Sequence, residues 1–199
     1  MNVIDDVTKT AATEVPVHPL LSARWSSRAF DPGHELADEQ LTAVLEAARW
    51  APSASNTQPW RFAVTRRGTA EHAAVLGTLA AGNQVWAQDA SALVVVAART
   101  KGTDGAAQPW AVYDAGQAAA HLSVQAEAEG LAVHQMGGFD CDRLTSVLAA
   151  EDVTPLVVVA IGLRDHHSRL AEPLAGRETA ARARLPIGDL LLEVQPDGS

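Results

Sequence analysis

Two short apolar runs constrain the fold of this chain more than any other feature. The segments 93–98 and 156–161 contain no charged residue and are rich in valine. Runs of this length and composition are typical of strands that are buried on both faces of a sheet. Segments with helical periodicity lie before, between and after them. We therefore expect an α+β or α/β domain in which helices cover one central sheet.

The segments around these runs carry their own start and stop signals. Asp38 is expected to cap a helix that runs to about Trp50, where Pro52 stops it. A longer helix is expected over 109–129, and its small residues would let another helix approach closely. Shorter helices are expected over 17–23, 69–80, 84–88 and from Asp140 or Asp142 to Ala150, and further strands over 61–66, 131–134 and 190–194.

Composition limits the class of protein and its partners. The chain has 199 residues, 47% of them hydrophobic and 20% charged, which are globular values. We expect an N-terminal arm over 1–15 and a single domain over 16–199. The net charge of −9 argues against nucleic acid as the partner, although a small anionic ligand needs only a few local arginines.

The cysteine content and the hydropathy of the chain indicate the cellular compartment in which it is expected. The single cysteine, Cys141, excludes an intramolecular disulfide and a multi-cysteine metal site, and it is expected to be a buried small hydrophobe. No stretch approaches the ~20 apolar residues of a membrane span. The N-terminal residues lack the apolar run of a signal peptide. A cytoplasmic protein that binds neither membrane nor metal is expected.

Several common catalytic motifs are absent from the sequence. No G-x-G-x-x-G follows a strand, and there is neither a phosphate-binding P-loop nor a G-x-S-x-G nucleophile elbow. The pair His166-His167 has adjacent side chains that diverge, so a solvated loop is expected there. These absences leave two unusual polar segments as the candidates for a site.

The first polar segment places two arginines four residues apart. Arg24 and Arg28 enclose Ser26 and Ser27, and on a helical turn residues at this spacing share a face. Guanidinium groups bind phosphate in a bidentate fork, and hydroxyl groups add further donors. The segment therefore predicts either a phosphate site on a helical turn or an ordinary solvated basic turn.

The second polar segment, 51–60, is an uncharged turn that ends in Pro-Trp. Its polar side chains are hydroxyls and amides, among them Ser53, Asn56 and Gln58. Amides both donate and accept hydrogen bonds, which suits the edge of a heterocycle with alternating C=O and N–H groups. The same residue types also cap helices and form turns. The segment predicts either a heterocycle-binding loop or a capped turn.

The order of these elements resembles the nitroreductase family of flavoproteins. The shared order is Arg-x-Ser-x-Arg, a single helix, Ala-Pro-Ser-x-x-Asn-x-Gln-Pro-Trp and then a strand. Three later segments extend the resemblance over about residues 17–194. They are Asn83 in Gly-Asn-Gln-Val-Trp, the pair Gly137-Gly138 before Phe-Asp, and Arg182-Ala183-Arg184 before Leu-Pro.

The resemblance implies an α+β fold with a central mixed sheet flanked by helices, in an intertwined homodimer whose FMN sites lie at the interface. It implies that Arg24, Ser26, Arg28 and Arg184 hold the phosphate and ribityl chain, with Arg182 nearby. The ring would meet Asn83 and the 136–138 backbone, while 52–56 would come from the second subunit. The cofactor-binding residues expected on this basis are Arg24, Trp25, Ser26, Arg28, Pro52, Ser53, Ala54, Asn56, Gln58, Asn83, Met136, Gly137, Gly138, Arg182 and Arg184.

The sequence departs from the family at three places. Trp25 replaces a second basic residue, and Trp86 stands where some members have a lysine directed at the flavin. The stretch His134-Gln135-Met136 replaces a Pro-x-Glu-Gly segment. These departures leave FMN binding expected, but they put the electron donor and acceptor in doubt.

The resemblance also implies a reaction. An FMN-dependent oxidoreductase would take hydride from NADH or NADPH and reduce nitroaromatics, quinones or similar small acceptors by a ping-pong mechanism. No side-chain acid or base is required, so no catalytic residue is expected, and His134 is expected to be a structural donor. The alternatives are a specialised flavin reaction (reductive dehalogenation, enone reduction or flavin destruction), a non-catalytic flavin-binding or storage protein, and a scaffold that binds nothing.

Overall fold

The two valine-rich runs form the two central strands of one sheet. A computed structural model describes residues 9–150, 152–165 and 169–195. The strands are β1 (Trp60–Arg66), β2 (Ala92–Ala98), β3 (Ala132–Met136) and β4 (Thr154–Gly162), in the order β1-β2-β4-β3. Every residue of β2 is buried, as expected of a central strand covered on both faces.

The strands pair in an antiparallel manner throughout the described sheet. A parallel contact comes from the isolated bridge between Ser26 and Val133, at the outer edge of β3. The expected α+β class is confirmed. The resemblance implies a sheet with both parallel and antiparallel pairs. In the part of the chain that the structure describes, this bridge is the parallel pair.

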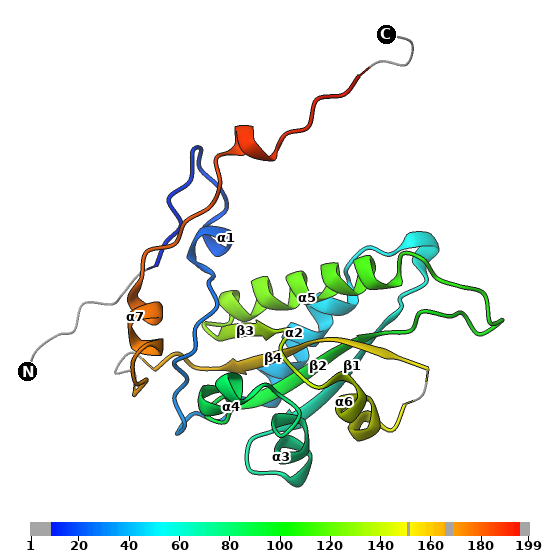
Figure 1. Cartoon of the computed structure of the whole chain (residues 1–199), viewed down its shortest axis with the longest axis horizontal. Coiled ribbons are helices and arrows are strands. Elements are labelled where there is room, and N and C mark those ends of the chain that lie inside the picture. The colour runs from blue at the N-terminus through cyan, green and yellow to red at the C-terminus, as the bar shows by residue number, and fades with distance from the viewer. Residues whose placement is uncertain (1–8, 151, 166–168, 196–199) are drawn as a thin grey trace, which may run out of the picture.

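Helices cover both faces of the sheet (Figure 1). The side chains of β2 point alternately to the two faces of the sheet, because successive side chains of a strand point in opposite directions. Val94 and Val96 pack against α2 (Asp38–Arg49) and α5 (Ala111–Ala128). Leu93 and Val95 join the second core with α3 (Ala70–Leu76), α4 (Ala81–Ala87) and α6 (Cys141–Leu148).

Most expected elements form within a few residues of their predicted limits, with some differences at the caps. Ala37 is the N-cap of α2, and Asp38 is the first helical residue. Asp140 caps α6 through its side chain, which accepts from the backbone N–H of Arg143 at 3.1 Å. The helix expected over 69–80 ends at Leu76, and a turn joins it to α4. Pro155 lies in β4 at a register irregularity opposite Ala97, where a strand tolerates a missing N–H.

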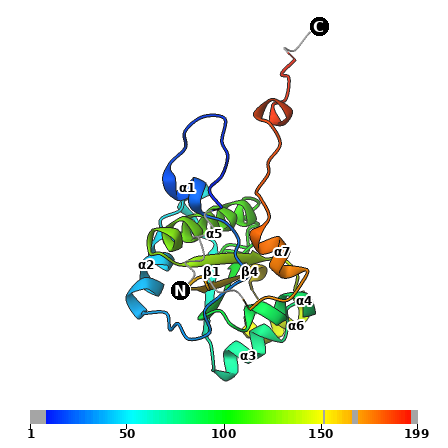
Figure 2. The same cartoon turned by 90° about the vertical axis from the view of Figure 1, so that its left-hand side faces the viewer.

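The two terminal segments lie side by side, and the parts before α1 and after α7 extend away from the sheet (Figure 1 and Figure 2). The N-terminal segment leads into α1 (Pro19–Ala23), and the C-terminal segment contains α7 (Leu174–Thr179) and the 3-10 turn η2 (Ile187–Leu190). The backbone N–H of Ile187 donates to the Glu14 carboxylate at 3.1 Å. Of the expected arm 1–15, residues 1–8 lie outside the described residues.

The strand expected over 190–194 does not form. Leu190 ends η2, and the residues after it project into solvent, where Leu192 is 92% exposed. A strand needs a neighbouring strand, and none lies beside this segment in the described chain. The apolar pattern that predicted a strand therefore marks an exposed apolar segment.

Three further expectations concern Cys141, the pair His166-His167, and binding to membranes or metals. The thiol of Cys141 is exposed, so the expectation of a buried hydrophobe is wrong; the residue starts α6 at the surface. The pair His166-His167 lies outside the described residues. Within residues 9–150, 152–165 and 169–195, no helix has the length and apolar character needed to cross a membrane, and no group of three His, Cys, Asp or Glu side chains is placed to share a metal ion.

Candidate functional site

The first arginine motif is extended, so the expected helical turn is wrong. Helix α1 ends at Ala23, and the next residues run along β3 through the bridge of Ser26 to Val133. Burial alternates along the segment: Trp25 and Ser27 are buried, whereas Ser26 is exposed. In an extended chain residues i, i+2 and i+4 share a side. The spacing Arg-x-Ser-x-Arg thus matches the period of a strand; Arg24 and Ser26 line one cavity, and Arg28 lines another.

A cavity of about 400 Å³ opens beside the start of this segment. Its polar lining includes Arg24, Ser26 and Gln135. The Gln135 amide nitrogen donates to the Ser123 hydroxyl at 2.9 Å and to the Ala119 carbonyl at 3.3 Å, which fixes the side chain between β3 and α5. The remaining lining residues are Leu21, Ala120, Ser123, Val124 and Val133.

The late basic element lies near Arg24. Burial lowers the pKa of Arg24; the charge of Glu127 opposes this shift, and the charge of Arg184 adds to it. Burial, and then the charges of Arg24 and Arg184, lowers the pKa of Arg182. The guanidinium groups of Arg24 and Arg182 thus carry their charge in unfavourable surroundings, and an anion bound beside them would stabilise that charge. The chain therefore brings together Arg24, Arg182 and Arg184 from segments about 160 residues apart in the sequence.

The backbone around this cluster is held by side chains of both terminal segments. The guanidinium of Arg182 donates to the carbonyl of Ser22 at 2.7 Å and to that of Lys9 at 2.8 Å. The carboxylate of Glu178 accepts from the Ser27 hydroxyl and from the backbone N–H of Arg28. Glu178 could not be singled out from the sequence, because one of three acids in an arginine-rich segment carries no local signal.

The tryptophans that depart from the family pattern are core residues. Trp86 is 1% exposed and packs between Phe30, with ring centroids 6.2 Å apart, and His134, at 4.6 Å. The indole of Trp25 is buried between the ammonium of Lys9 and the guanidinium of Arg164. Neither indole lines the cavity beside Arg24, so the side chain of Trp25 is not part of that lining.

His134 lies beneath the arginine motif. Its Nδ1 is 3.0 Å from the carbonyl oxygen of Ser27, which can only accept, so Nδ1 carries the proton. Burial, together with the charges of Arg28 and Arg24, lowers the pKa of His134 to about 4. The ring is therefore neutral near pH 7 and acts as a structural donor.

The expected ring-side residues meet at the end of β3. The Asn83 amide nitrogen lies 3.4 Å from the carbonyl oxygen of Gly138, which also accepts from the backbone N–H of Ala80 at 2.8 Å. A Cβ at Gly138 would meet the Asn83 amide at 3.2 Å, whereas a Cβ at Gly137 would meet nothing within 4 Å. Met136 is buried in the second core, on the side of the sheet that α4 covers.

The second polar segment forms a strained, exposed turn before β1. Ser55, Asn56 and Gln58 have φ values of 51°, 56° and 48°, in the left-handed region that residues with a Cβ avoid. Such conformations persist where surrounding contacts hold them, and they cluster at functional sites. The carboxylate of Asp114 accepts from the backbone N–H of Ala54 at 3.0 Å, and the Ser53 hydroxyl accepts from that of Gln58 at 3.1 Å.

This turn lies far from the arginine cluster of the same chain. The turn precedes β1, whereas the Arg24 segment runs along β3, and these strands form opposite edges of the sheet. The turn is tied to Asp114, near the start of α5, whereas Arg24 interacts with Glu127 near its end. Thirteen helical residues of 1.5 Å rise separate these anchors by ~20 Å. The structure does not bring the two motifs together within one chain.

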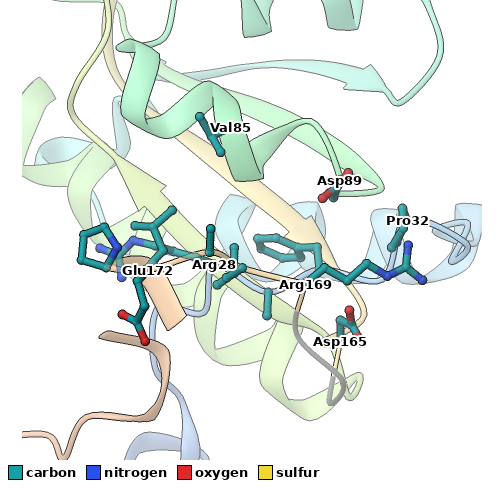
Figure 3. A pocket seen from close by; sticks show the side chains of 13 residues that line it. Arg28, Pro32, Val85, Asp89, Asp165, Arg169 and Glu172 are labelled. Atoms are coloured by element: carbon teal, nitrogen blue, oxygen red, sulfur yellow. The ribbon is translucent and has the colours of Figure 1, made fainter. Parts of the chain in front are cut away.

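A second cavity, of about 270 Å³, lies on the Arg28 side of the motif (Figure 3). Asp89, Asp165 and Arg169 gather at one side of it and Arg28 lies at the other. Burial raises the pKa of Asp89, against the charges of Arg67 and Arg169. The apolar part of the lining is Ala29, Phe30, Pro32, Val85, Leu170, Ala171, Pro173 and Leu174.

Comparisons with known proteins identify the family. A model described as "Nitroreductase family" matches residues 21–163. The chain is 37% identical over 135 residues to an "Uncharacterized 15.4 kDa protein in ask 5'region" of Mycolicibacterium smegmatis, which covers 64% of this chain and 90% of that protein. It is 37% identical over 81 residues to the oxygen-insensitive NAD(P)H nitroreductase of Salmonella typhimurium, which covers 39% of this chain and 36% of that enzyme.

A solved structure agrees over nearly the whole length. It is described as the crystal structure of the oxidoreductase containing FMN, and it superposes with a TM-score of 0.86 at 37% identity. The match covers 94% of this chain and 96% of that one. Because the family model spans most of the chain and the fold agrees, the chain belongs to the nitroreductase family.

Proposed function

We propose that this protein is an FMN-dependent oxidoreductase that takes electrons from NADH or NADPH and reduces nitroaromatics, quinones or similar small acceptors. The observation that carries the proposal is that Arg24 and Ser26 line one cavity, while Arg182 donates to the nearby Ser22 carbonyl and the charge of Arg184 acts on Arg24. The names of the similar proteins, an NAD(P)H nitroreductase and an oxidoreductase containing FMN, support it.

The residues present suit the phosphate of FMN. A phosphate monoester carries close to two negative charges at pH 7 and three acceptor oxygens. Arg24 and Arg184 would bind it, the exposed Ser26 hydroxyl would donate to it, and Arg182 would add charge from behind while it holds Ser22. Binding would relieve the repulsion among the guanidinium groups, so the cluster is better matched to an anion than to water.

The ring would lie toward the end of β3. The amide of Asn83 would face its polar edge, and the backbone of 136–138 would line it, with the open space at Gly137 allowing close approach. When bound, FMN supplies the chemistry by accepting hydride from NAD(P)H and passing electrons to the acceptor. The neutral His134 would hold the arginine motif in place through Ser27 and would donate no proton to substrate.

A homodimer would complete the site. The turn with Pro52, Ser53, Ala54, Asn56 and Gln58 lies at the opposite edge of the sheet from the Arg24 segment, so a second copy would supply it. The outward face of α5 supports such an assembly, because Val112 and Tyr113 are exposed beside the small residues Gly116 and Ala120. Hydrophobic residues exposed in this way favour burial against a partner. A cytoplasmic location stays a prediction from the sequence.

The purified protein tests the proposal directly. We expect a yellow protein with flavin absorption that bleaches rapidly when NADH or NADPH is added and recovers when a quinone is added. A colourless protein that binds no added FMN would contradict the proposal and favour the scaffold. A flavin that neither nicotinamide reduces would favour the storage protein. A stopped-flow reductive half-reaction with each nicotinamide, followed by a panel of acceptors, identifies the donor and the acceptor class.

A further inference from the structure

The carboxylate of Glu178 holds the middle of the arginine motif. Glu178 is 7% exposed, and the three groups that donate to it lie in consecutive residues. The Ser27 hydroxyl donates to Oε1 at 2.5 Å, the backbone N–H of Arg28 donates to Oε2 at 3.0 Å, and that of Ala29 approaches Oε1 at 3.4 Å. Hydrogen bonds to a carboxylate are the strong kind, so this segment has little freedom to shift.

The same side chain determines where the second half of the arginine cluster lies. Glu178 belongs to the last turn of α7, and the chain continues from there to Arg182 and Arg184. The helix is tied down again by the ammonium of Lys9, which donates to the carbonyl of Arg177 at 3.2 Å. One buried carboxylate therefore joins the segment that carries Arg24 and the segment that carries Arg184.

The negative charge of Glu178 opposes the binding of an anion near it. Burial lowers the pKa of Lys9; the charge of Glu178 opposes this shift, and the charges of Arg182, Arg28 and Arg164 add to it, so the carboxylate lies within a group of cations. A negative charge in this place weakens the attraction of the group for a phosphate. Its charge and its contacts thus have opposite effects on anion binding.

We propose that Glu178 is a positioning residue of the cofactor-phosphate site, which orients the arginines of both terminal segments toward one anion. The proposal rests on the proposed function, because it requires FMN as the ligand. It assigns to Glu178 an effect on the phosphate end of the ligand only. A purely structural role would instead change the binding of every part of the ligand equally.

The test compares FMN with riboflavin, which has the same ring and no phosphate. In Glu178→Gln the side chain keeps its size and loses its charge and one acceptor. We expect its Kd for FMN, measured by quenching of flavin fluorescence, to rise about tenfold, with the Kd for riboflavin within about twofold of wild type. Glu71→Gln removes a carboxylate from the exposed face of α3 and serves as the matched control, with both Kd values unchanged.

Other results would overturn this proposal or the proposed function. Tighter FMN binding by Glu178→Gln would show that its charge matters and its contacts do not, and would overturn the proposal. Equal weakening for FMN and riboflavin would also overturn it, since the role would then be structural. If Glu178→Gln fails to fold, Ser27→Ala removes a donor to the same carboxylate, and the same loss specific to FMN is expected. A wild-type protein that binds neither flavin would refute the proposed function itself.

Discussion

The buried carboxylate of Asp114 accepts a hydrogen bond from the backbone N–H of Ala54 at 3.0 Å. This contact links the first turns of α5 to the strained turn before β1. It helps to hold a short exposed loop in which three residues lie in the left-handed region. The contact therefore gives a buried side chain of α5 a part in the shape of this turn.

Asp114→Ala should release this turn. We expect the free energy of unfolding to fall by about 1–3 kcal/mol, because the variant leaves a partly buried N–H without its acceptor. FMN should bind more weakly although Arg24 is untouched. Urea denaturation and flavin titration measure the two effects. Asp104→Ala is the matched control, because it removes an acceptor from the exposed backbone N–H of Ala106, which water can replace. It should change neither the free energy of unfolding nor the affinity for FMN appreciably. Unchanged FMN affinity in Asp114→Ala would show that the turn is not part of the FMN site.

Gly137→Ala distinguishes a packing glycine from a ligand-facing one. Its Cβ would meet nothing within 4 Å, and the residue has no positive φ, so the protein itself tolerates alanine. We expect an unchanged melting temperature and a clear loss of FMN affinity, because the added methyl group would meet the flavin ring. An unchanged FMN affinity, measured by fluorescence titration, would remove Gly137 from the proposed site.

His134 makes the stability of the protein depend on pH. Its pKa is about 4 in the folded chain, against about 6.5 when unfolded, so the unfolded chain takes up the proton first as the pH falls. The stability of the wild type should thus decline between about pH 6.5 and pH 4, and the His134 contribution to this loss is roughly 3 kcal/mol. His134→Gln keeps a donor toward Ser27 and should show a shallower decline in urea denaturation. Parallel curves for the two proteins would contradict the assignment.

Arg184→Ala tests the placement of the phosphate. A charge-assisted contact is worth roughly 1.5–3 kcal/mol, so the Kd for FMN should rise about ten- to hundredfold. Arg177→Ala removes an exposed arginine from the same terminal segment and should leave the Kd unchanged. Equal affinities in wild type and Arg184→Ala would place the phosphate elsewhere.

The strands and the family could be predicted from the sequence, because the valine runs and the motif order are local signals. The conformation of Arg24–Ser26–Arg28 could not, since this spacing matches one face of a helix as well as one side of a strand. The bridge from Ser26 to Val133 decides between them, and it is a tertiary contact. The apolar residues 190–194 were misread for the same reason: a pattern does not show whether a partner strand exists.

The roles of the acids Asp114 and Glu178 could not be predicted from the sequence either. Asp114 and Glu178 accept from residues 60 and 150 positions away in the chain, so no window of sequence contains both partners. Trp86 stands where some members of the family have a lysine directed at the flavin. Its burial against Phe30 and His134 depends on how α4 packs on the sheet.

The central claim is that each FMN site combines the Arg24 side of one chain with the Asn56 turn of another. Heterodimers of Arg24→Ala and Asn56→Ala, isolated with two different affinity tags, test it most directly. If sites are shared across a two-fold axis, both substitutions fall in one site and the other site is wild type. We predict that each heterodimer binds one FMN with wild-type affinity, although both parent variants bind weakly. Heterodimers that contain no wild-type site would contradict the account.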